Sequence, residues 1–325
     1  MRFASFNADG RNRFGVSPDA VRIYDLTGKL EASDWGGLAP RTMLEFIEAG
    51  PAALQQAEAL QQEMLRRPDA FLSFPVDSVR FLAPVTRPSK ICCIALNNSA
   101  NVDRIIRGPK HPAMFVKAAN TLIGHGDQIV CKPAYGRVHP EPELALVIGK
   151  TAKDVPVAKA YEHVFGYTIH NDVTSPTMRG EDTFHYRAIH PKNGNEREIE
   201  YVDTWVSYPG RYKGCDTFAC MGPWLVTQDE IPDPHDLAVE CRTNGELVTA
   251  DNTRNLFYKV PEVIAFLSGY LTLLPGDIVS MGTALQPSST GGGAVQNINL
   301  GISGTRVSVS IERIGTLENT SLLVD

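Results

Sequence analysis

The chain has 325 residues, of which 43% are hydrophobic and 21% charged, so it can bury a sizeable core and does not have a disordered composition. Its formal net charge is −6 and its 31 lysine and arginine residues are scattered, so we expect neither a nucleic acid nor a membrane surface as its partner. The length suggests about two domains.

The beginning of the sequence lacks the apolar stretch of a signal peptide, and no apolar run reaches the roughly 20 residues that span a bilayer. We therefore expect a cytoplasmic protein. The six cysteines form no C-x-x-C pair, which favours reduced thiols over a disulfide framework.

Residues 1–85 have the pattern of a small α/β domain. Two β-type runs flank the turn-forming pair Asp9-Gly10, which predicts a hairpin. From Pro40 to Arg67 apolar residues recur at helical spacing, and Gly50-Pro51 divides this stretch into two helices.

Residues 86–325 read as a β-dominated α+β domain, because short apolar runs alternate with glycine and proline turns. The predicted strands are 91–96, 128–132, 144–148, 164–170, 224–227, 238–243, 277–281 and 305–311. The clearest helix is residues 260–271. The Gly291-Gly292-Gly293 run lacks the strand-to-helix context of a phosphate-binding turn.

Glu141 and Glu143 are two residues apart at the head of an apolar strand, so their side chains point to the same side. Two carboxylates that close repel each other unless a cation lies between them. This pair alone also fits a solvated acidic turn. Asp172 adds a third carboxylate at the end of another apolar strand, and three carboxylates with water suit Mg²⁺, Mn²⁺ or Ca²⁺ but not zinc.

Five motifs, in this order along the chain, resemble those of the fumarylacetoacetate hydrolase superfamily. They are Glu141-x-Glu143-Leu-Ala-x-Val-Ile-Gly149, Gly166-Tyr-Thr-x-x-Asn171-Asp172-Val173, Lys213-x-x-Asp216-Thr-Phe-x-x-x-Gly222-Pro, Asn244-Gly245-Glu246 and Leu274-Pro-Gly-Asp277-x-x-x-x-Gly282-Thr283. The resemblance covers most of the chain from Ser89 to Asn319, and the first 85 residues look like the small domain that precedes the catalytic one in many members.

The resemblance implies a fumarylacetoacetase C-terminal-like fold, a mixed β-sheet roll, for the catalytic domain, and it implies a homodimer. It also implies that Glu141, Glu143 and Asp172 bind one Mg²⁺ or Mn²⁺. Members act on 2-oxo acids and β-diketones, where such a cation polarises the carbonyl and stabilises an enolate. We therefore expect a small 2-oxo or dicarboxylic acid as the substrate.

The resemblance further implies that Lys213 is a catalytic residue and that Lys117, Gly282 and Thr283 bind the substrate. A lysine near the cation adds positive charge where the enolate or carboxylate forms. Without the flanking motif, Lys213 would be read as a solvated loop lysine.

The sequence departs from the family at two places that matter for catalysis. Hydrolytic members activate water with a histidine and a glutamate, but Asn101 and Arg104 stand at these positions, and an amide cannot accept a proton at neutral pH. Further on, Pro176 replaces a substrate-facing arginine, and we expect the nearby Arg179 to recognise an anionic group instead.

Histidines elsewhere could replace the missing base. His111 lies in a Gly-Pro and His-Pro loop, His185 lies in a stretch that reads as an insertion, and His170 shares a strand face with Asp172. Each one also fits an ordinary surface or hydrogen-bonded histidine. We place His111 and His185 with Lys213 as candidate catalytic residues.

Three functions are compatible with these patterns. The first is a metal-dependent hydrolase that cleaves a C–C bond in a β-diketo or acylpyruvate-type 2-oxo acid. The second is a tautomerase or decarboxylase of a 2-hydroxydienedioate or an oxaloacetate-like acid, which needs no activated water. The third is a binding protein without catalysis, which three mutually repelling carboxylates argue against.

Overall fold

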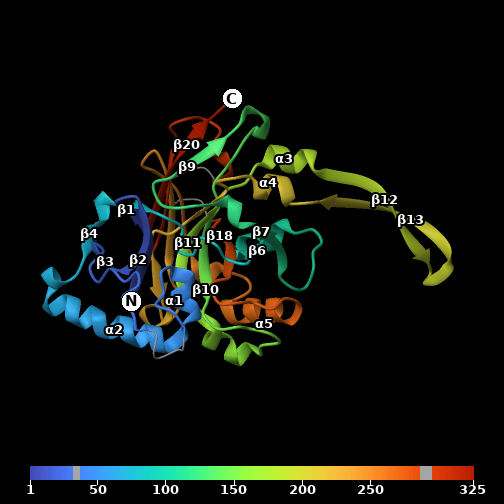
Figure 1. The fold of residues 1–325 in the computed structure, drawn as a ribbon. Coiled ribbons are helices and arrows are strands. Elements are labelled where there is room, and N and C mark those ends of the chain that lie inside the picture. The colour runs from blue at the N-terminus through green and yellow to red at the C-terminus, as the bar shows by residue number, and fades with distance from the viewer. Residues whose placement is uncertain (32–36, 286–294) are drawn as a thin grey trace.

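A computed structural model describes residues 1–31, 37–285 and 295–325, without the side chains of residues 102–104. The Gly291–Gly293 run therefore lies outside the described residues. Strands dominate the structure, and helices cover them, so the predicted α+β architecture is confirmed (Figure 1).

The largest sheet in the described part of the chain has thirteen strands. Its main path runs through β4 (Ser73–Pro75), β3 (Arg22–Asp25), β2 (Arg11–Val16), β1 (Arg2–Ala8), β15 (Leu225–Thr227), β11 (Val164–Asp172), β10 (Pro142–Ile148), β18 (Ile278–Thr283), β6 (Ile91–Ala95) and β7 (Ala113–Lys117). Beside this path lie β5 (Arg80–Phe81), β8 (Leu122–Ile123) and β14 (Ala219–Met221).

A second sheet packs across the first, and a hairpin forms a third. The second sheet has the order β17 (Glu246–Asn252), β16 (Ala238–Thr243), β19 (Arg306–Ile311), β20 (Gly315–Leu323) and β9 (Gln128–Cys131). The hairpin consists of β12 (Thr183–Lys192) and β13 (Asn195–Ser207). The α-helices are α1 (Met43–Glu48), α2 (Gly50–Arg66), α3 (Pro176–Glu181), α4 (Gly210–Gly214) and α5 (Val260–Tyr270).

The N-terminal residues fold as the sequence predicts. β1 and β2 form the hairpin around Asp9-Gly10, and the helical stretch breaks at Gly50, whose φ of 75° favours glycine. The β-type run predicted after the turn, from Phe14 to Leu26, forms two strands, β2 and β3, instead of one. Because β1 also pairs with β15, these strands continue the large sheet. The domain boundary at residue 85 stays a prediction.

The central strand β10 is buried along its whole length, because apolar layers cover both faces of the sheet. Leu144, Leu146 and Ile148 point into a core shared with the second sheet and α5. The alternate residues Ala145 and Val147 point into a core shared with α1 and α2. This two-sided burial explains why the sequence of β10 is continuously apolar after Glu143.

The β12–β13 hairpin is the largest element that the sequence did not predict. It projects far from the rest of the molecule, whereas the other strands lie in the body (Figure 1). All six cysteines are free, as predicted. The described residues contain no helix with the length and apolarity needed to cross a membrane.

Phe46→Ala tests whether the N-terminal helices and the large sheet share one core. The Phe46 ring centroid lies 5.0 Å from that of Phe3 and 6.0 Å from that of Phe165 on β11. Truncation of this buried ring should lower the free energy of unfolding by about 3–5 kcal/mol. Chemical denaturation followed by circular dichroism and tryptophan fluorescence should show one shared transition.

The exposed Phe257 provides the control, because Phe257→Ala should change stability by less than about 0.5 kcal/mol. Two separated transitions, or an equally small effect at Phe46, would contradict a shared core.

Candidate metal centre

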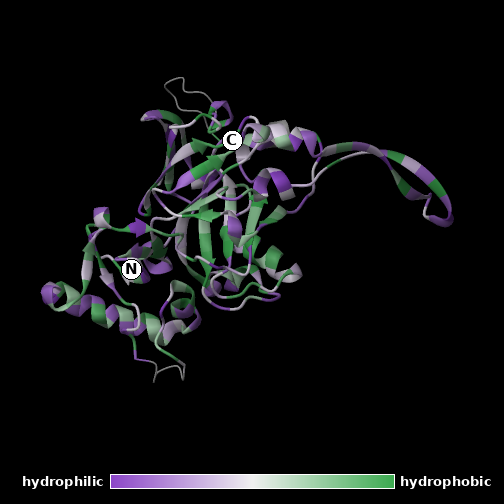
Figure 2. Cartoon of the chain, turned by 45° about the horizontal axis from the view of Figure 1, so that its top comes forward, coloured by the Kyte–Doolittle hydropathy of each residue, from purple (hydrophilic) through white to green (hydrophobic). Residues whose placement is uncertain are grey.

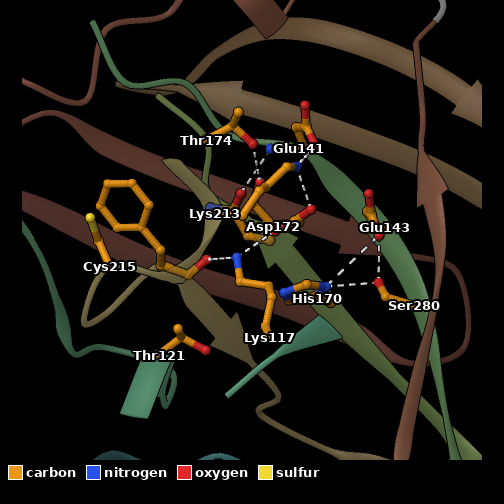
Figure 3. Close-up of polar contacts among 12 residues, drawn as sticks. Lys117, Thr121, Glu141, Glu143, His170, Asp172, Thr174, Lys213, Cys215 and Ser280 are labelled. Atoms are coloured by element: carbon orange, nitrogen blue, oxygen red, sulfur yellow. Dashed lines mark hydrogen bonds and ion pairs between the residues drawn. The ribbon is translucent and has the colours of Figure 1, made fainter. Parts of the chain in front are cut away.

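Three predicted carboxylates converge because strand β10 begins beside the residues at which its antiparallel neighbour β11 ends. Glu143 on β10 lies opposite His170 on β11, which brings Glu141, just before β10, beside Asp172 at the end of β11. The backbone N–H of Asp172 donates to the carbonyl of Glu141 at 2.9 Å. One carboxylate oxygen from each of the three residues lies within 4.8 Å of the others (Figure 3).

Two buried lysines reach into this cluster from other elements. Lys213 comes from α4, and its Nζ lies 2.5 Å from both Glu141 Oε2 and Asp172 Oδ2. Lys117, the last residue of β7, donates to Asp172 and, at 2.6 Å, to the carbonyl of Phe218. Since Lys213 is buried and paired, it is not a solvated loop lysine.

The ion pairs keep these buried groups charged. Burial opposes the ionisation of Asp172, but the ammonium groups of Lys117 and Lys213 lower its pKa below the ordinary value. Burial likewise opposes the charge of Lys213, but Asp172 and Glu141 raise its pKa above the ordinary value. At neutral pH the site therefore contains a fixed ammonium between two carboxylates.

Glu143 is held by hydrogen bonds from β18. Ser280 Oγ donates to Glu143 Oε2 at 2.5 Å, and Thr283 Oγ1 donates to Glu143 Oε1 at 3.1 Å. His170 Nδ1 lies 2.7 Å from Ser280 Oγ. Because the single hydroxyl proton of Ser280 goes to the carboxylate, Nδ1 must be the donor in this contact. His170, Ser280 and Glu143 thus form a directed hydrogen-bond chain.

Gly282 completes this side of the site through its backbone. Its N–H donates to Glu143 Oε2 at 3.3 Å, and its φ is 99°. A Cβ at this position would lie 2.9 Å from Asn97 Cβ and 3.0 Å from the carbonyl oxygen of Ile94. Both the conformation and the close packing require glycine here.

The donor set fits a hard divalent cation. All three candidate ligands are carboxylates, which Mg²⁺ and Mn²⁺ prefer. The carboxylates exceed the two lysines by one negative charge, so the lysines alone leave the cluster anionic. A divalent cation would leave it positive, which suits an anionic ligand.

The structure does not bring every predicted site residue to the carboxylates. His111 stacks on Phe266 with ring centroids 5.3 Å apart, and His185 stacks on Trp205 of the projecting hairpin at 4.1 Å. Arg179 is exposed on α3. The catalytic roles of the two histidines and the anion-binding role of Arg179 stay predictions.

Asn101 is buried within the turn of 3₁₀ helix that spans residues 99–104. Arg104, which replaces the family glutamate, has no described side chain.

Several residues of the site had no role in the sequence analysis. Ser280 lies in a predicted strand, but only its pairing opposite Ala145 of β10 brings it to Glu143. His139 Nε2 lies 4.0 Å from Glu141 Oε1. Cys93 is fully buried nearby, and burial together with Asp172 and Glu143 raises the pKa of its thiol, so it is an inert neighbour.

Known proteins are similar to this chain in sequence and in fold. A model of the family described as fumarylacetoacetate (FAA) hydrolase C-terminal matches residues 90–321. The mitochondrial oxaloacetate tautomerase Fahd2a of Rattus norvegicus is 34% identical over 257 residues, which cover 79% of this chain and 73% of that protein.

Two solved structures align over their whole length with the whole of this chain. The maleylpyruvate hydrolase of Sphingobium sp. SYK-6, in complex with manganese (II) ion and pyruvate, is 25% identical with a TM-score of 0.69, and 100% of both chains is covered. The 5-carboxymethyl-2-hydroxymuconate delta-isomerase of Mycobacterium smegmatis is 27% identical with a TM-score of 0.66, again over 100% of both chains.

The hydrogen-bond chain to Glu143 can be tested by metal affinity. Ser280→Ala and His170→Ala each remove one link, so we expect the dissociation constant for Mn²⁺ to rise about 10- to 100-fold in isothermal titration calorimetry. Ser321→Ala, which also removes a buried hydroxyl but outside the site, should leave it unchanged. If Ser280→Ala and His170→Ala bind Mn²⁺ with the same dissociation constant as Ser321→Ala, Glu143 needs no such support.

Proposed function

The chain belongs to the fumarylacetoacetate hydrolase family, as its motifs predict, and within this family we propose that it is a metal-dependent tautomerase of a 2-oxo dicarboxylic acid such as oxaloacetate. One observation carries the proposal. The carboxylates and lysines that handle an enolate are assembled, but Asn101 stands where hydrolytic members have their water-activating histidine.

Tautomerisation and hydrolysis make different demands on such a site. A tautomerase moves one proton between carbon and oxygen, whereas a hydrolase must also deprotonate an attacking water. The buried amide of Asn101 supplies no base for that second task. The oxaloacetate tautomerase among the relatives is 34% identical to this chain, whereas the maleylpyruvate hydrolase is 25% identical. The higher identity also supports tautomerisation over hydrolysis.

The residues of the chain suit an enolisable dianion. A divalent cation held by Glu141, Glu143 and Asp172 would supply Lewis-acid polarisation of the substrate carbonyl. Lys213 stays protonated because its carboxylate partners raise its pKa, so it stabilises developing negative charge and does not act as a base. We assign Lys117, Gly282 and Thr283 to the substrate side of the site, with Arg179 as a further contact for an anionic group.

Hydrolytic C–C cleavage is the second candidate function, because a relative with the same fold is a maleylpyruvate hydrolase. The two functions differ in their products. A tautomerase speeds the approach of oxaloacetate to its keto–enol equilibrium and forms neither pyruvate nor CO₂. A hydrolase consumes an acylpyruvate and yields two acids, which NMR resolves.

We expect enol absorbance of oxaloacetate to relax faster with enzyme and Mg²⁺ or Mn²⁺, and the acceleration to disappear with chelator. Lys213→Met should lower kcat/KM for this reaction by about 30- to 1,000-fold, since it removes an electrostatic stabiliser worth on the order of 2–4 kcal/mol. The exposed Lys150→Met should have no effect. Near wild-type turnover by a folded Lys213→Met protein would contradict the assignment.

For proton transfer we propose His111 or His185, as the sequence predicts. His111→Ala or His185→Ala should lower the rate of enol relaxation about 10²- to 10⁴-fold, because each would remove a general acid–base group. His163→Ala provides the control, because the half-buried ring of His163 contacts the Lys150 carbonyl and no residue of the carboxylate cluster. Unchanged rates in both test variants would exclude these histidines.

A further inference from the structure

A cavity lies where the N-terminal strands and α2 meet the later part of the chain. Its volume is about 380 Å³, and its walls come from β1, α2, β15 and the turn between β19 and β20. The amino terminus lies at this place, near α2 (Figure 1). Cavities of this size hold small molecules in many proteins. The cavity shares no residue with the carboxylate cluster, so it belongs to a different site.

Gln61 is a polar residue on the core-facing side of α2. The buried residues of this helix are Ala53, Ala57 and Met64, and Gln61 continues their stripe at helical spacing. Figure 2 shows hydrophilic residues among hydrophobic ones along α2. Within the described part of the chain, the buried Oε1 of Gln61 has no hydrogen-bond partner. Because buried polar atoms are normally hydrogen-bonded, this oxygen indicates a donor from a ligand.

Arg2 repeats this situation on β1 with a donor. It lies on the same face of β1 as Ala4 and Phe6, which belong to the hydrophobic core. Its guanidinium carbon lies 5.8 Å from the centroid of the Trp224 ring. Its Nε is buried and has no acceptor among the residues that the structure describes. The cavity therefore presents an unused donor on a positive group and an unused acceptor.

The charges of the cavity lining are unbalanced. Arg313, in the turn between β19 and β20, lines the cavity with Arg2 and is exposed, so this side is open to solvent. Over the described ranges of the chain, no carboxylate oxygen lies within 4.0 Å of a guanidinium nitrogen of either arginine. The acidic residue of the lining is Glu230, whose Oε1 lies 3.1 Å from the amino group of Met1. Two arginine charges are thus left for a ligand, which must be an anion.

We propose that this cavity binds a phosphate monoester of a polyol. The phosphoryl group would lie on Arg2 and Arg313, and a hydroxyl group would donate to Gln61 Oε1. A guanidinium donates to phosphate oxygens through hydrogen bonds that its charge strengthens. A phosphate monoester carries nearly two negative charges at neutral pH, so one group balances both arginines. A polyol hydroxyl is a donor, as the amide oxygen requires.

Such a ligand would connect two parts of the chain. Arg2 and Gln61 belong to the predicted small domain of residues 1–85, whereas Arg313 belongs to the remainder. Because the ligand contacts both parts, it binds the folded chain and not the unfolded one, and binding should raise the melting temperature. Binding does not involve the carboxylates. The inference therefore holds whether or not the chain is the tautomerase proposed above.

Isothermal titration calorimetry of the full chain with glycerol 3-phosphate tests the proposal. It is run at about pH 8, where the phosphate is a dianion, with a chelator that keeps cations out of the carboxylate cluster. We expect one site per chain in wild type. Arg2→Met and Arg313→Met should each raise the dissociation constant about 10- to 100-fold, because each removes charge-assisted hydrogen bonds. Arg11→Met, at the exposed turn end of the β1–β2 hairpin, is the matched control and should bind like wild type. Circular dichroism checks that each variant is folded.

Gln61→Leu tests the hydroxyl contact. It should weaken the binding of glycerol 3-phosphate about 3- to 10-fold and leave the binding of methyl phosphate, which has no alcohol hydroxyl, unchanged. Malate is the comparison ligand, because it carries its two charges on separate carboxylates. The proposal is overturned if wild type binds no glycerol 3-phosphate at millimolar concentration, which means that the cavity holds only water, or if both arginine variants bind like wild type. Tighter binding of malate would overturn the assignment to a phosphate.

Discussion

The structure depends on the convergence of three carboxylates in a buried place. Glu143 and Asp172 are almost inaccessible to water, and like charges this close are stable only with positive charge among them. Lys117 and Lys213 supply part of that charge from two elements that lie far apart in the sequence. The antiparallel pairing of β10 with β11, the short helix α4 and the edge strand β7 all serve to bring these charges together.

The same constraint links the fold to the chemistry. Strand β10 is apolar on both faces after Glu143, so the candidate ligands Glu141 and Glu143 lie at the beginning of a doubly covered strand. The chain from His170 through Ser280 fixes the orientation of Glu143. Under the proposed function such a site would stabilise an enolate, and Asn101 in place of the family histidine favours chemistry that needs no activated water.

Local patterns predicted the carboxylates, because the two-residue spacing of Glu141 and Glu143 already fixes their common direction. They also predicted the break between α1 and α2 and most strands of the body. They did not predict the pairing of Lys213 with Asp172 or the role of Ser280, since both depend on strand register and on contacts between distant segments. The sequence did not predict the β12–β13 hairpin, because its charged and aromatic residues follow one another without a clear apolar face.

The most direct test of the central claim is a crystal structure grown with Mn²⁺ and recorded at a wavelength that gives its anomalous signal. The account predicts one anomalous peak coordinated by Glu141, Glu143 and Asp172, with the Lys213 ammonium shifted from its place between Glu141 and Asp172. No peak at saturating Mn²⁺, with Lys213 still bonded to both carboxylates, would contradict it. In that case the cluster would be a buried ion-pair network and not a metal centre.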